Sequence, residues 1–206
     1  MGQYADGLRL QPVQIIPNYQ IAKIIKEFLF IKEYGEKSFA AICEKFANFG
    51  AVNGVKRILF VCHGNICRSP MAEFILKAMV RARGVEDRYL IESAAVSDEE
   101  IGNGIYPPAR RCLNQHGVWF DTHKTARRIT PADYGRFDRI ICMDRSNLRW
   151  LEHIIPDDPE NKIHLMMSYT GHARDVADPW YTGDFEQTFQ DILEACTCML
   201  DCRTDN

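Results

Sequence analysis

The feature that most constrains the fold is a regular alternation of apolar, strand-like segments with amphipathic, helix-like segments from Arg57 onward. Parallel strands need a long crossover between them, usually a helix, whereas antiparallel strands can be joined by a short turn. The alternation therefore predicts an α/β fold, a four-stranded parallel sheet with helices on both faces and a site at the carboxyl ends of the strands. We expect the strands at 58–61, 89–94, 139–143 and 163–166.

The ends of the expected helices are indicated by residues with local preferences. Ser69 is the expected N-cap of the first helix, with Pro70 at its first position and Gly84 as its stop. Further helices are expected at 108–115, from Thr130, at 146–155 and at 185–200.

Residues 1–54 precede this alternation and have a different pattern. Apolar residues at helical spacing fall in two stretches, 21–28 and 39–46, which predicts a short helical hairpin joined by a Gly- and Asn-rich linker to a domain at 55–206. Such a hairpin is too small to bury enough apolar surface alone, so it needs a partner. The alternatives are the following domain, a second copy of the chain, another protein or, least favoured, a membrane surface. An extension with no function is the remaining reading.

The net charge of -3, from 25 basic and 28 acidic side chains, argues against a protein whose main task is to bind nucleic acid. The first residues lack the basic start and apolar core of a signal peptide, and the apolar run at 28–31 is far too short to cross a bilayer. We therefore expect a cytoplasmic protein that does not insert into membranes. In that compartment the 8 cysteines are expected to be reduced thiols.

The loop after the first strand, with the sequence VCHGNICRSP at 61–70, carries the main chemical signal. It joins a buried strand to a helix start, so its backbone N–H groups can converge on an anion, with Gly64 and Asn65 supplying permissive backbone conformations. Arg68 adds a fork that matches two phosphate oxygens, and these positive surroundings favour Cys62 as a thiolate. The loop therefore predicts a cysteine nucleophile at a phosphate site, against the alternative of a buried structural cysteine beside a surface arginine.

A second signal is the segment DPWY at 178–181, which follows the fourth strand. An aryl phosphate departs as a phenolate, so a carboxylic acid that delivers a proton as the bond breaks assists the reaction, and its carboxylate can then activate water. Asp178 is the candidate for this role. Pro179 stiffens the loop, and Trp180 with Tyr181 can form the wall of the entrance and stack on a substrate ring. An ordinary Asp-Pro turn is the alternative.

The segments at 61–70, 142–147 and 178–181 match, in order, those of the low-molecular-weight protein tyrosine phosphatases, and the chain resembles this family from about Val55 to Asp201. The resemblance implies a flavodoxin-like fold and hydrolysis of phosphotyrosine through a cysteinyl-phosphate, without metal or cofactor. It implies Cys62 as nucleophile, Arg68 as phosphate clamp and Asp178 as general acid and base. The implied substrate-binding residues are His63, Gly64, Asn65, Ile66, Cys67, Ser69, Trp180 and Tyr181, of which Asn65 fixes the loop and Ser69 supports the thiolate.

Two residues of the loop have a further implied role. Cys67 can trap an oxidised Cys62 as a disulfide, which protects the nucleophile from irreversible oxidation, although plain packing is the alternative. In the arginine-phosphatase branch of the family a threonine stands at the position of Ile66, so Ile66 with Trp180 and Tyr181 favours an aromatic over a guanidinium leaving group.

Other residues are expected to lie apart from the chemistry. His123 and Arg127 are expected to be solvated, with a role in the site as the minor alternative. Cys196, Cys198 and Cys202 are interpreted as core or surface thiols, because helical geometry turns Cys198 away from Cys196 and so opposes a metal cluster.

Two other functions stay open at this point. A thioredoxin-coupled arsenate reductase would need a relay of further cysteines, and Cys142 is the one thiol near a suitable position. A phosphate-binding interaction module without catalysis is the second alternative, and the intact nucleophile, arginine and acid oppose it.

Overall fold

The computed structural model describes residues 54–172 and 174–201 of the 206-residue chain. The helical hairpin expected at 21–28 and 39–46 lies outside the described residues, as does Cys202. The described elements, in chain order, are β1 (Lys56–Cys62), α3 (Arg68–Ala82), η1 (Glu86–Arg88), β2 (Tyr89–Ala95), α4 (Pro107–Gln115), α5 (Pro131–Arg136), β3 (Arg139–Cys142), α6 (Arg145–Glu152), β4 (Ile163–Leu165), η2 (Met166–Thr170), α7 (Pro179–Thr182) and α8 (Phe185–Asp201).

The four strands form one parallel sheet in the order β2-β1-β3-β4, which confirms the expected fold class. β1 lies between β2 and β3, so the chain builds outward from β1 first on one side and then on the other. In a sheet of this type ligands bind where the strand order reverses, outside the carboxyl end of the central strand. That position is occupied by Cys62, the last residue of β1.

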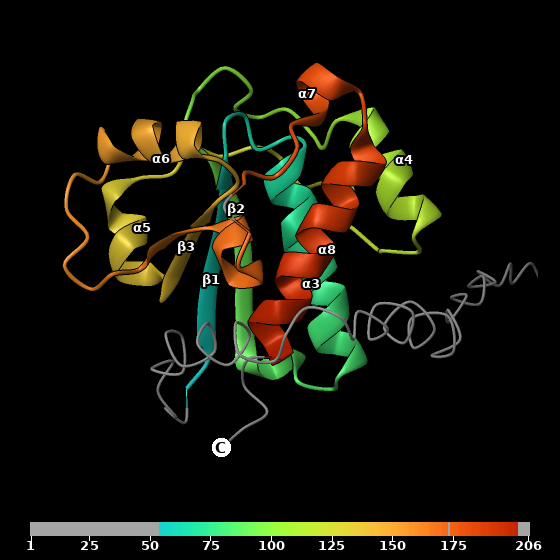
Figure 1. The fold of residues 1–206 in the computed structure, drawn as a ribbon, viewed down its shortest axis with the longest axis horizontal. Coiled ribbons are helices and arrows are strands. Elements are labelled where there is room, and N and C mark those ends of the chain that lie inside the picture. The colour runs from blue at the N-terminus through green and yellow to red at the C-terminus, as the bar shows by residue number, and fades with distance from the viewer. Residues whose placement is uncertain (1–53, 173, 202–206) are drawn as a thin grey trace, which may run out of the picture. The chain divides into compact units, whose positions relative to one another are not determined.

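Both faces of the sheet are covered, as the apolar sequence of β1 requires. In Figure 1, α3, α4 and α8 lie together on one side of the sheet, and α5 and α6 lie on the other. Leu59 and Val61 are fully buried in the core beneath α5 and α6, together with Phe137 and Leu151. Because side chains alternate along a strand, Phe60 and Cys62 face the opposite side, where α3 packs.

The first helix differs from the sequence-based expectation at its start. α3 begins at Arg68 with Cys67 as N-cap, so the assignment of Ser69 as N-cap is wrong. The reason is that the Ser69 hydroxyl is engaged by Asn65 and Cys62 rather than by the end of the helix. Gly84 follows the helix with a φ of 66°, a left-handed conformation that suits the expected stop.

Later elements follow the predictions with small shifts. Thr130 and Asp133 form the capping box of α5, as Thr130 at an expected helix start suggests. α6 ends at Glu152, earlier than expected, because the N–H groups of Ile154 and Ile155 both donate to Leu151 O in a turn. The segment after Asp178 forms the short helix α7 where a loop was expected. Within the described residues, no helix has the length and apolarity to cross a membrane.

Candidate active site

The loop between β1 and α3 folds back over the end of its own strand. Asn65 has a φ of 57°, and its backbone N–H donates to Cys62 Sγ at 3.3 Å. Asn tolerates this left-handed conformation better than most residues, which explains an asparagine here. Gly64 has no positive φ, so the expected backbone freedom is wrong for this residue. Glycine suits this position because it has no side chain: a Cβ on Gly64 would lie 2.9 Å from Glu100 Cγ.

The Asn65 side chain fixes the loop to three separate segments. Its Nδ2 donates to Ser69 Oγ and to Ser93 Oγ, each at 2.8 Å, and its Oδ1 accepts from the backbone N–H of Arg127 at 3.2 Å. Ser93 in turn donates to the buried Glu73 carboxylate at 2.6 Å. Both amide hydrogens and the amide oxygen are thus used, as a side chain only 1% exposed requires. The loop is held in its folded-back shape before any ligand arrives.

Cys62 is 3% exposed and lies against hydrogen-bond donors at the start of α3. Ser69 Oγ lies 3.0 Å from Cys62 Sγ. Because Ser69 accepts from Asn65 Nδ2, its own hydroxyl hydrogen is available to the sulfur. The hydroxyl, the Asn65 N–H and the positive end of the helix all favour negative charge on Sγ. This environment suits a thiolate nucleophile.

Arg68 is held between two carboxylates. Its Nη1 lies 2.5 Å from Asp144 Oδ2, and its Nη2 lies 2.6 Å from Asp178 Oδ2, with the arginine side chain 5% exposed. Burial opposes the charge of Arg68, but the negative groups of Cys62, Asp178 and Asp144 outweigh it and raise the pKa of the guanidinium. The guanidinium is therefore charged and oriented within the site.

Asp144 was not recognised as a site residue by sequence reasoning. Besides pairing with Arg68, it is the N-cap of α6, where Oδ1 accepts from the Asn147 N–H at 2.6 Å. The available signal was its place in the matched segment at 142–147, directly after the buried strand β3.

Asp178 is the N-cap of α7 and has a similar double role. Its Oδ1 accepts from the Trp180 N–H at 3.0 Å, while Oδ2 contacts Arg68. Trp180 and Tyr181 follow on the same short helix and are 60% and 86% exposed. α7 therefore presents one carboxylate toward the loop and two aromatic residues to the surroundings of the site.

These groups line one cavity of about 390 Å³. Of the residues expected in the site, those in its lining are Cys62, His63, Gly64, Ile66, Cys67, Arg68, Asp178, Trp180 and Tyr181. Asn65 and Ser69 are not in the lining, and their side chains act on the loop from behind. The structure thus brings together the segments at 61–70 and 178–181, which are more than a hundred residues apart in sequence.

The cavity lining also contains residues that sequence reasoning did not identify. Trp150 on α6 is 49% exposed and lies edge-on to the His63 ring, with centroids 5.9 Å apart. His63 Nε2 also lies 3.0 Å from Glu99 Oε2. Glu99, Glu100 and Trp150 all line the cavity. A tryptophan among the polar residues of 145–152 was the available sequence signal for these residues.

Three residues outside the lining bear on the alternatives. Arg127 was expected to be solvated, but it pairs with Glu92 at 3.1 Å and with Asp133 at 3.0 Å. Its backbone N–H also donates to Asn65 Oδ1. His123 is exposed, as expected. Cys142 is fully buried in the apolar core, where burial raises the pKa of its thiol, so it is poorly suited to a thiol relay.

Comparisons with known proteins agree with this geometry. Residues 57–204 match the family model described as low molecular weight phosphotyrosine protein phosphatase. The phosphatase of that name from Sus scrofa is 41% identical over 152 residues, which cover 71% of this chain and 94% of the relative.

Two solved structures have the same fold and match this chain over nearly their whole length. The low molecular weight protein tyrosine phosphatase SP-PTP from Streptococcus pyogenes is 38% identical with a TM-score of 0.66, covering 74% of this chain and 95% of that one. The drosophila arginine phosphatase DARP is 35% identical with a TM-score of 0.65, covering 72% of this chain and 99% of that one.

Proposed function

Because the chain belongs to the low molecular weight phosphotyrosine protein phosphatase family and is therefore a cysteine-dependent phosphotyrosine phosphatase, we propose that Cys62, Arg68 and Asp178 carry out its reaction. The observation that supports this assignment is their convergence in one cavity, where Arg68 is 2.6 Å from Asp178 and lies in the loop that begins at Cys62. The nucleophile, the phosphate clamp and the acid thus come together from two segments that are far apart in sequence.

In the first step, the phosphoryl group binds to the N–H groups of the loop and to Arg68. Its oxygens take the place of the Asp178 carboxylate on the guanidinium, because both are anions that match the same fork. Cys62 Sγ then attacks phosphorus and the bond to the tyrosyl oxygen breaks. Asp178, which takes up a proton from solvent once it has left Arg68, delivers that proton to the tyrosyl oxygen, so the product leaves as a neutral phenol.

In the second step, water attacks the phosphorus of the phosphocysteine. The Asp178 carboxylate accepts a proton from the water, and Cys62 departs as a thiolate stabilised by the Ser69 hydroxyl. Inorganic phosphate leaves, Asp178 releases this proton to solvent, and the Arg68 to Asp178 pair can form again. Asp178 therefore serves both half-reactions, and Asp144 keeps Arg68 oriented throughout.

Leaving-group dependence tests the role of Asp178. Asp178→Asn is expected to lower kcat on phenyl phosphate by about two to four decades, and much less on an aryl phosphate whose leaving group is very acidic. Asp175→Asn is a matched control, because Asp175 lies in the same loop but pairs with Arg145 at 2.9 Å. An equal loss on both substrates would remove Asp178 from the acid role.

The nucleophile is tested separately. Cys62→Ser should abolish turnover and keep affinity for inorganic phosphate, because the loop amides and Arg68 remain while a hydroxyl is a poor nucleophile at neutral pH. Activity near that of the unmodified chain would overturn the covalent mechanism.

We further propose that this site prefers phosphotyrosine to phosphoarginine. Ile66 is 9% exposed, lines the cavity and belongs to a small apolar cluster against which Tyr106 and Phe185 pack, so the substrate ring would enter beside an apolar side chain. Ile66→Thr should shift the ratio of kcat/KM values toward phosphoarginine. Comparable kcat/KM values of the unmodified protein on the two substrates would contradict the preference.

We also propose that the protein works in the cytoplasm. The active-site thiols Cys62 and Cys67 are not joined in a disulfide, and the mechanism needs Cys62 reduced, which a cytoplasmic redox poise maintains. Fractionation of expressing cells checks this proposal, and recovery of the chain from an oxidising compartment would refute it.

A further inference from the structure

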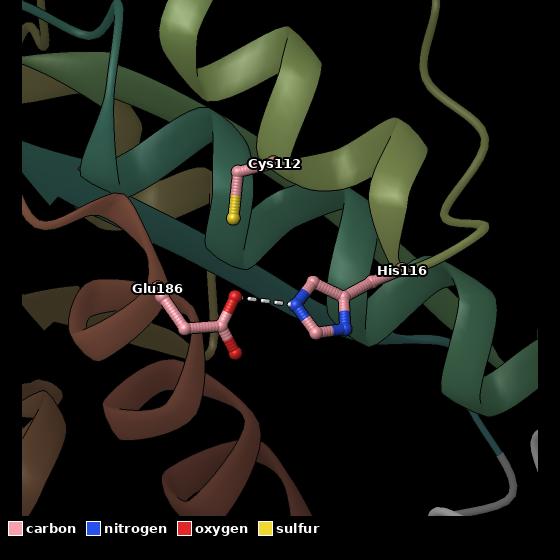
Figure 2. Close-up of side chains that lie close together, drawn as sticks. All are labelled: Cys112, His116 and Glu186. Atoms are coloured by element: carbon pink, nitrogen blue, oxygen red, sulfur yellow. Dashed lines mark hydrogen bonds and ion pairs between the residues drawn. The ribbon is translucent and has the colours of Figure 1, made fainter.

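A second cluster of chemically active side chains lies between α4 and α8. Within the described part of the chain, Cys112, His116 and Glu186 form the one group of three such residues whose ligand-type atoms all lie within 4.8 Å of one another. Figure 2 shows the Cys112 sulfur, the His116 ring and the Glu186 carboxylate directed toward a common space. None of the three lines the active-site cavity.

Helix geometry explains why these residues meet. Cys112 and His116 are four residues apart at the end of α4, so they lie on the same face one turn apart. Glu186 is in the first turn of α8, which packs against α4. The thiol and the imidazole therefore come from one helix and the carboxylate from the other.

The three side chains are held in position by their neighbours. The His116 ring stacks on Phe189 with centroids 3.7 Å apart, and its Nε2 lies 2.7 Å from Glu186 Oε2. Gln190 donates to the other carboxylate oxygen at 2.6 Å. Partners of this kind orient metal ligands and fix their ring planes. Cys112 Sγ donates to Phe185 O at 3.4 Å.

The donor set points to one class of ion. Thiolate, imidazole and carboxylate together are the ligands of Zn²⁺, whereas Mg²⁺ and Ca²⁺ take oxygen ligands almost exclusively. Tetrahedral Zn²⁺ places its ligand atoms about 3.3 to 3.7 Å apart, so small side-chain rotations would complete the geometry. The carboxylate of Glu186, 56% exposed, leaves a route for the ion to enter.

We propose that Cys112, His116 and Glu186 form a Zn²⁺ site with three protein ligands and a fourth position for water. On binding, Cys112 releases its thiol proton to solvent, and His116 carries its ring proton on Nδ1, so that Nε2 can bind the metal. The bonds from Cys112 to Phe185 O and from His116 to Glu186 are replaced by bonds to the metal. The ion ties the end of α4 to the start of α8. It stabilises the native state because the unfolded chain does not hold these three groups together.

The site adjoins the segment that carries Asp178. A cavity of about 510 Å³ is lined by Cys112 and Glu186 on one side and by Pro179 and Trp180 of α7 on the other. Tyr106, also in its lining, lies 5.6 Å from the Trp180 ring and donates its backbone N–H to Ile66 O. The ion would therefore restrain α4 and α8, which lie beside α7. This effect on α7 rests on the proposed function, whereas the binding of Zn²⁺ does not.

Metal titration of the full chain tests the site. Cys62→Ser serves as the background, because it removes a second thiol with affinity for Zn²⁺. Calorimetric titration with Zn²⁺ is compared with titrations after further substitution by Cys112→Ser, His116→Ala or Glu186→Gln. Each of these is expected to weaken the tight binding event at least about tenfold, as the loss of a ligand should. Co²⁺ should show a thiolate charge-transfer band that Cys112→Ser abolishes.

Two control substitutions on α8 match the ligands in type. Glu194→Gln removes a carboxylate that lies 3.2 Å from His172 Nε2, a comparable His–Glu pair outside the group. Cys198→Ser removes a thiol of the same helix. Both should leave the affinity for Zn²⁺ and the Co²⁺ band unchanged.

Thermal unfolding guards against variants that merely fail to fold. Glu186→Gln keeps an oxygen that accepts from His116, so its unfolding temperature without metal should stay close to that of the background while the rise caused by Zn²⁺ is reduced or lost. Equal Zn²⁺ affinity in the background and in Cys112→Ser, or a Co²⁺ complex without the thiolate band, would show that the cluster is only a helix-to-helix ion pair. The same conclusion follows if Glu186→Gln gains as much stability from Zn²⁺ as the background.

Discussion

Replacement of Asn65 by alanine is the sharpest test of how the active-site loop is held. The Asn65 side chain makes three hydrogen bonds, to Ser69, to Ser93 and from the backbone of Arg127. At about 1 kcal/mol of net stability for each bond, their loss destabilises the protein by about 3 kcal/mol. Alanine at a φ of 57° adds about 1 kcal/mol of backbone strain, for a total of about 4 kcal/mol.

Asn65→Gly separates the two contributions. Glycine loses the same three hydrogen bonds but adopts a positive φ without strain, while its freedom in the unfolded chain costs about 0.4 to 1 kcal/mol. The glycine variant should therefore be more stable than the alanine variant by up to about 0.6 kcal/mol. Both should lose activity, because the Ser69 hydroxyl is then free to turn away from Cys62.

Urea unfolding measures the stabilities, and kcat/KM on an aryl phosphate measures the activity. Asn103→Ala is the control, because the exposed Asn103 side chain donates to the Glu100 carboxylate at 2.7 Å outside the buried loop network, and we expect a loss below about 0.5 kcal/mol. The predicted order of stability is wild type, glycine, alanine. An alanine variant within about 1 kcal/mol of wild type, or one clearly more stable than the glycine variant, would refute this account of the loop.

Three further outcomes are expected. Burial, with the charge of Arg139, lowers the pKa of His164 from 6.5 to about 4. Between these pH values the unfolded chain binds a proton at His164 that the native chain does not. The contribution of neutral His164 to stability is therefore fully present above pH 6.5, and the free energy of unfolding falls by about 2 kcal/mol between pH 7.5 and 5. Urea unfolding should find this loss much reduced in His164→Gln. Cys67→Ser should lower the activity that dithiothreitol restores after treatment with hydrogen peroxide, because no neighbouring thiol remains to condense with the Cys62 sulfenic acid, with release of water, before excess peroxide oxidises it to the irreversible sulfinic acid. Equal recovery of both proteins would contradict this. A chain that starts at about Val55 should keep its phosphatase activity within roughly threefold, or about 0.7 kcal/mol in the barrier, whereas a folded truncation reduced a hundredfold would show that residues 1–54 complete the site.

The Cys67 prediction depends on a property that only the structure reveals. Burial raises the pKa of the Cys67 thiol to about 12, and the negative charges of Cys62 and Asp178 act in the same direction. Cys67 is therefore protonated at neutral pH and does not compete with Cys62 as a nucleophile. Oxidation of Cys62 removes one of these charges, which lowers the barrier to forming the disulfide at the moment it is needed.

Much of this protein follows from its sequence, because the decisive patterns are local. The alternation of strand and helix segments determines a parallel sheet, since each crossover needs a helix. Cys62, Asn65 and Arg68 are within seven positions of one another, so one strand-to-helix loop must bring them together. Asp178 follows the last strand, and the carboxyl ends of parallel strands share one edge of the sheet.

What the tertiary structure decided is the set of partners that lie far apart in sequence. Asp144 reaches Arg68 from 76 positions away, and Ser93 reaches Asn65 from 28, because the order β2-β1-β3-β4 places β2 and β3 beside β1. Periodicity and capping preferences report only on neighbours along the chain, so neither pair could be inferred from them. The same reason applies to Glu186, which meets His116 across 70 positions only because α8 packs on α4.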